Sequence, residues 1–188
     1  MANRLVELQH INMSRMAIGF CQARKPVAHG LQAALTPMRF ERGQRYTVRR
    51  DQTFTVQQIV DESGREFLYL LTFYLPRFLN LPFGEKLVTI LHELWHISPC
   101  FDGDLRRHEG RCYIHTASER EYDVAMEKLA KKWLACRPSP AIYAFLRESF
   151  DSLRSKHGRV FGTRIPAPKL IPCVASEVSA LTSDTPAD

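Results

Sequence analysis

Short apolar runs separated by turn residues dominate the first half of the chain. Residues 16–20 form one such run and predict a strand. Further along, residues 46–48 and 53–60 precede the turn sequence Asp61-Glu62-Ser63-Gly64, and the apolar run 67–74 follows it. This arrangement predicts a β-hairpin across the turn.

In the second half, apolar positions repeat at steps of three and four residues, which is typical of amphipathic helices. The first predicted helix spans residues 84–97 and stops before Pro99. The second begins at a capping box formed by Ser118 and Glu121. Its buried stripe is expected to contain Tyr122, Met126, Leu129 and Trp133.

A third helix is predicted from residue 141 to about residue 156, between the break at Pro138-Ser139-Pro140 and Gly158. With the strands before it, this order of elements predicts an α+β fold. We expect one domain over residues 1–173. The small and polar residues 174–188 are expected to form a disordered tail.

The composition is that of an ordinary folded protein, with 188 residues of which 45% are hydrophobic and 24% charged. The first twenty residues lack the uninterrupted apolar stretch of a signal peptide, and no later window is long and apolar enough for a membrane span. Five cysteines without a C-x-x-C pair predict reduced thiols. We therefore expect a soluble, cytoplasmic protein that does not engage a membrane.

The formal net charge of +6 comes from Lys and Arg residues that are scattered along the chain. A compact basic block with interleaved aromatic residues, as found in nucleic-acid-binding proteins, does not occur. A nucleic-acid partner is therefore possible but not indicated by the sequence.

The chemistry concentrates in the motif His92-Glu93-Leu94-Trp95-His96. Two histidines four residues apart lie on one face of a helix, close enough to bind the same metal ion. Glu93 follows the first histidine directly, where its carboxylate can take a proton from a metal-bound water as general base. Burying these groups on a mostly apolar helix is costly unless a partner compensates them, and a zinc ion is the simplest one.

The residues around this motif resemble an uncharacterised bacterial family of predicted HExxH metallopeptidases. The resemblance rests on LHELWHISP (91–99), FDGDLRR (101–107), Gly110-Arg111, Tyr113 and His115, and extends over residues 5–172. It implies a zincin-like domain in which a twisted sheet lies beside the motif helix and offers an edge strand to an extended peptide. Residues 67–74 are the expected edge strand.

Several residues remain open as the third metal ligand. The longer H-E-x-x-H-x-x-G-x-x-H pattern fails, because Pro99 and Asp102 stand at its last two fixed positions. His115 is the first choice, since it precedes the capped helix and the family resemblance implies a histidine there. The alternatives are His108, Asp102 and Glu119.

Basic and phenolic residues near the motif are weaker candidates. A substrate carboxylate or the oxyanion could be held by Arg106, Arg107 or Arg111, and Tyr113 could donate to the oxyanion. For all three arginines, pairing with acidic residues of the same loop is the favoured role.

Three functions fit these residues. The leading one is a zinc metallopeptidase that acts on a peptide or protein substrate. A second is a metal-dependent hydrolase or protease that acts on nucleic acid or DNA-bound protein. A third is a non-catalytic binding module stabilised by a metal with four protein ligands.

Overall fold

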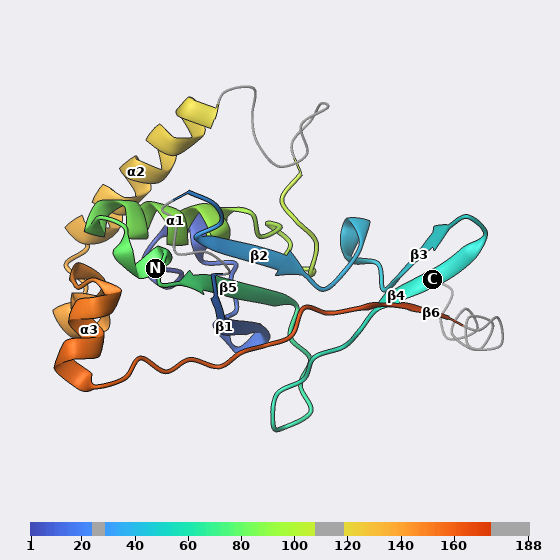
Figure 1. Ribbon diagram of the computed structural model, residues 1–188. Coiled ribbons are helices and arrows are strands. Elements are labelled where there is room, and N and C mark those ends of the chain that lie inside the picture. Colours follow the sequence, from blue (N-terminus) through green and yellow to red (C-terminus); the bar gives the residue numbers. More distant parts are fainter. Residues whose placement is uncertain (24–28, 108–118, 174–188) are drawn as a thin grey trace.

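The structure is a computed structural model that describes residues 1–23, 29–107 and 119–173 (Figure 1). The first of its two sheets has the strand order β1-β5-β2, in which β5 is parallel to β1 and antiparallel to β2. Its strands are β1 (Met16–Gln22), β2 (Ala33–Pro37) and β5 (Tyr69–Leu75). The predicted strand at residues 16–20 is confirmed as part of β1.

The central position of β5 contradicts the prediction that residues 67–74 form the edge strand. Tyr69, Leu70 and Leu71 are at most 3% exposed, so this strand is buried on both faces. A continuous apolar run without alternation is typical of a central strand. The edges of the sheet are β1 and β2.

The second sheet has the strand order β3-β4-β6 and extends away from the helices (Figure 1). Its strands are β3 (Tyr46–Arg49), β4 (Gln52–Val56) and β6 (Leu170–Pro172), all antiparallel. Arg50 and Asp51 join β3 to β4 with φ angles of 51° and 62°, the left-handed conformation of tight hairpin turns.

The predicted hairpin between residues 53–60 and 67–74 is therefore wrong, although the turn at residues 61–64 does form. The Asp61 carboxylate accepts hydrogen bonds from the Ser63 and Arg65 backbone N–H groups. Only the Val60–Glu66 bridge pairs the two arms. The strand β4 pairs instead with β3 and with the distant β6, so it never reaches β5.

Helix α1 (Phe83–Trp95) carries the motif and lies within two residues of its predicted bounds at each end. It packs against helix α2 (Glu119–Ala135) and strand β2. The stripe predicted for α2 is confirmed, with exposures between 1% and 9% for Tyr122, Met126, Leu129 and Trp133. The capping box at Ser118 and Glu121 lies outside the residues whose side chains the structure describes.

The third predicted helix is only partly correct. Two 3-10 turns, Pro140–Ile142 and Ala144–Arg147, precede helix α3 (Phe150–His157), which Gly158 ends with a φ of 74°. The ammonium of Lys86 on α1 donates to the carbonyl oxygens of Leu146 in the second turn and of Glu148 directly after it, at 2.8 and 2.6 Å. A continuous helix does not form here, because these carbonyl oxygens accept hydrogen bonds from the buried Lys86 ammonium and the backbone of Glu148 is extended.

The mixed α+β class is thus confirmed, with a small sheet beside α1 and two helices that follow α1 in the chain (Figure 1). Over the described ranges, every helix is too short or too polar to cross a membrane. The predicted tail 174–188 lies outside these ranges.

Candidate functional site

His92 and His96 project from α1 onto one side of the helix. Their ring centroids are 4.7 Å apart, and the ring planes meet at 81°. His96 is 8% exposed, whereas His92 is half-buried. The predicted pairing of the two imidazoles is therefore present, and together they offer two nitrogen donors of the kind that zinc accepts.

Tyr122 of α2 forms the wall behind both imidazoles. Its ring centroid lies 4.7 Å from that of His92 and 6.0 Å from that of His96, almost parallel to the latter. Its hydroxyl lies 3.4 Å from the His92 carbonyl oxygen. Sequence periodicity identified Tyr122 only as a core residue, because spacing along α2 shows that a residue faces inward and not what it meets there.

Glu93 points from α1 toward the first sheet. Its Oε2 atom accepts a 2.8 Å hydrogen bond from the backbone N–H of Leu35 in β2. Burial raises the pKa of Glu93 to about 7, and the Leu35 hydrogen bond acts in the opposite direction. A carboxyl group with such a pKa can both accept and return a proton near neutral pH.

The contact with Leu35 lies on the outer edge of β2. Gln32 accepts from the Tyr74 N–H, and the Met38 N–H donates to Leu68, so these two residues face β5. Backbone groups of an antiparallel strand alternate in direction. Three residues of β2 therefore direct their backbone groups outward, namely Ala33, Leu35 and Pro37.

The loop after α1 is held by several specific contacts. Arg107 makes a two-point contact with the Asp104 carboxylate at 2.8 and 3.0 Å, which confirms the predicted pairing within the loop. The Tyr69 hydroxyl accepts from the Gly103 N–H and donates to the Asp104 carbonyl. These contacts fix the loop against the centre of the first sheet.

Arg106 departs from the predicted acidic pairing. Its Nε atom donates to the Trp95 carbonyl at 2.7 Å, its backbone N–H donates to the His96 carbonyl, and its guanidinium lies 4.3 Å from the Trp95 ring centroid. Arg106 thus satisfies two carbonyl groups at the C-terminal end of α1, one through its side chain and one through its backbone, and the helix dipole favours its positive charge there. Trp95 and His96 are held in place by the same residue.

The candidates for a third ligand are only partly placed. Asp102 accepts from the Asp104 N–H at 3.1 Å, as in a turn, and no three His, Cys, Asp or Glu side chains of the described ranges form a metal-binding group. This turn contact is the other role that the sequence left open for Asp102. His108, Arg111, Tyr113 and His115 lie outside the described residues, as does the side chain of Glu119.

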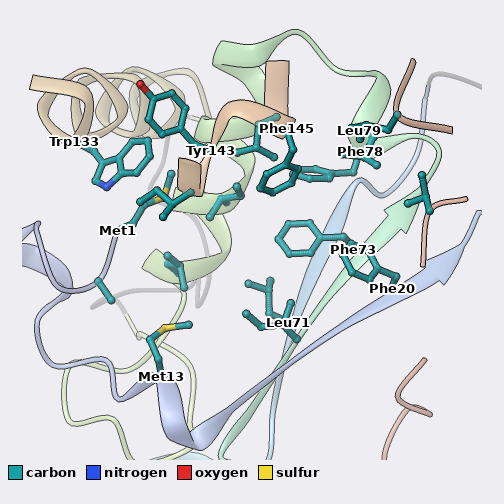
Figure 2. A pocket seen from close by; sticks show the side chains of 18 of the residues that line it. Met1, Met13, Phe20, Leu71, Phe73, Phe78, Leu79, Trp133, Tyr143 and Phe145 are labelled. Atoms are coloured by element: carbon teal, nitrogen blue, oxygen red, sulfur yellow. The ribbon is translucent and has the colours of Figure 1, made fainter. Parts of the chain in front are cut away.

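A separate cavity of about 640 Å³ lies on another side of α1 (Figure 2). Ile90 and Leu94 line it, and these positions face roughly opposite to His92 and His96 on a helix of 3.6 residues per turn. Other lining residues, including Leu71 and Phe73, come from the first sheet (Figure 2). The residues that line this apolar cavity do not include His92, Glu93 or His96.

No protein family, curated protein or solved structure matches this chain. The resemblance to HExxH metallopeptidases therefore remains a prediction that rests on the motif residues themselves.

Proposed function

We propose that this protein is a zinc-dependent hydrolase that cleaves peptide bonds. The observation that supports this best is the joint placement of His92, Glu93 and the outer edge of β2. Two imidazoles meet on one side of α1, and the neighbouring carboxyl group, with a pKa near neutral, touches the strand edge. An acid–base group, imidazole nitrogens that can bind a metal, and an extended backbone edge are components that a zinc-dependent peptidase uses.

His92 and His96 would hold the zinc ion, which when bound supplies Lewis acidity toward a carbonyl oxygen. Glu93 would accept a proton from the attacking water as its oxygen bonds to the peptide carbon. The same carboxyl group would return this proton to the amide nitrogen as the C–N bond breaks. Tyr122 packs on both imidazoles and keeps them oriented.

The proposed third ligand is His115, with His108 as the alternative. The choice rests on the sequence, and substitution tests it directly. Zinc content after dialysis should fall strongly in His115→Ala and stay near the wild-type value in His108→Ala. The opposite ranking would transfer the assignment to His108.

The test of the function is a paired measurement on the full chain. Zinc content is determined by elemental analysis, and cleavage of reduced, carboxymethylated casein is followed by mass spectrometry. We expect about one zinc per chain, cleavage that a chelator stops, and recovery when zinc is restored. A protein that takes up no zinc, or whose zinc-loaded form leaves this unfolded substrate intact, would contradict the proposal.

A further inference from the structure

The backbone N–H of Leu35 has two competing uses. It already donates to Glu93 at 2.8 Å. It also faces outward from β2, where an added strand would require it as a donor. Pro37 has no N–H, so among the three outward residues only Ala33 and Leu35 offer donors. One N–H cannot serve two acceptors at full strength, so the two uses exclude each other.

We propose that Glu93 and a docking peptide exchange on the Leu35 N–H. Glu93 occupies this donor in the resting protein, and a strand that pairs with the outer edge of β2 displaces the carboxylate. Substrate docking thereby releases the general base. This inference rests on the proposed function, because it takes a peptide as the occupant of the edge.

The surroundings of Glu93 determine what its carboxylate contacts once it is displaced. Across the described ranges, Leu35 is the only hydrogen-bond donor to this carboxylate. A displaced Glu93 must therefore turn to water or to the docked peptide, because an unpaired carboxylate in a largely buried position is costly. The base becomes available at the moment when a substrate lies along the strand.

Two proline substitutions distinguish the role of the Leu35 N–H from that of the other outward donor of β2. Leu35→Pro removes the donor that Glu93 uses, and Ala33→Pro removes the other outward donor. Neither N–H belongs to the ladder with β5, and edge strands accept proline where the N–H faces outward. Pro37 already occupies an equivalent outward position in the same strand.

The first measurement is amide hydrogen exchange by NMR in the full chain without added metal. The Leu35 amide should exchange at least about tenfold more slowly in the wild type than in Glu93→Ala. The Ala33 amide should exchange alike in both proteins. Equal Leu35 rates in the two proteins would show that the resting contact does not form, and would overturn the proposal.

The second measurement is the affinity of the metal-free chain for a Lys-flanked peptide of alternating Thr and Val, titrated by NMR. Glu93→Ala should bind it about tenfold more tightly than the wild type, because a competitor for the donor is gone. In the Leu35→Pro background, Glu93→Ala should leave the peptide affinity unchanged. In the Ala33→Pro background, it should still raise the affinity.

Three results would overturn the exchange. They are equal peptide affinity in the wild type and Glu93→Ala, a full increase of affinity on Glu93→Ala in the Leu35→Pro background, and no peptide binding to any variant. Because these assays use metal-free protein and no turnover, they are independent of the zinc and casein measurements. An intact exchange in a protein without zinc or cleavage would refute the proposed function alone. Cleavage without the exchange would refute this inference alone.

Discussion

Glu93 and Leu35 are 58 residues apart in the chain, yet the Oε2 atom of Glu93 lies 2.8 Å from the Leu35 backbone nitrogen. This hydrogen bond joins the motif helix α1 to the edge strand β2. The orientation of the candidate base therefore depends on the sheet as well as on its own helix. Any change that moves β2 relative to α1 is expected to alter the reaction without altering the histidines.

Glu93→Gln should slow hydrolysis strongly while the fold is retained. The amide keeps the size of the side chain and still offers an oxygen to the Leu35 N–H, but it cannot take the proton from water. Casein cleavage by the zinc-loaded variant is expected to slow by about 100- to 10,000-fold. Glu85→Gln, at an exposed position of the same helix, is the matched control and should retain wild-type activity.

His92→Ala and His96→Ala should uncouple stability from zinc. Free zinc at about one hundred times its dissociation constant adds about 2.7 kcal/mol to the free energy of unfolding, or about 5–10 °C in Tm for a chain of this size. Differential scanning calorimetry with and without a chelator should show this shift in the wild type and in His157→Ala, whose histidine is exposed on α3. A chelator-sensitive Tm in either motif variant would argue against its role as a ligand.

Lys86→Met should destabilise the fold by about 1–3 kcal/mol. Lys86 is 1% exposed, and its ammonium donates to two carbonyl groups that the methionine would leave without their donor. Burial also lowers the pKa of Lys86, so loss of the charge offsets part of the cost. Urea unfolding measures the difference, with Lys128→Met at an exposed position of α2 as control. A change within error of the control would mean that the two carbonyls find other donors.

Glu66 should make stability depend on acidic pH. Its carboxylate is 12% exposed and lies 2.5 Å from Arg39 and 3.4 Å from Arg45. The Arg39 hydrogen bond holds the pKa of Glu66 below its ordinary value. Its contribution is therefore fully present above the unfolded pKa of about 4.5 and is lost as the pH falls through the lower folded pKa.

The stability difference between wild type and Glu66→Gln should thus be largest near about pH 6 and shrink toward about pH 3. Urea unfolding across this range measures it. Glu62→Gln, at an exposed position nearby, should show no such trend. A difference that stays constant across the range would exclude titration of Glu66 as its cause.

Local patterns were sufficient for α1, for the buried stripe of α2 and for the motif. Spacing of apolar residues placed α1 and the buried stripe of α2, because each helix buries one face and that face recurs every 3.6 residues. The four-residue separation of His92 and His96 also follows from helix geometry alone. The turn at residues 61–64 could also be predicted from local sequence, because the Asp61 carboxylate accepts a hydrogen bond from the backbone N–H of Ser63 two residues later.

Only the tertiary structure decided which strands pair and which polar groups meet. The run 67–74 predicted a strand, but its central place depends on β1 and β2, which pair with it from 53 and 32 residues away at their nearest registers. Likewise, the contacts of Arg106 with Trp95, Lys86 with Leu146 and Glu93 with Leu35 join separate elements. Periodicity states which side of an element is buried, whereas partners across the core are selected by packing among distant segments, and that information is not local.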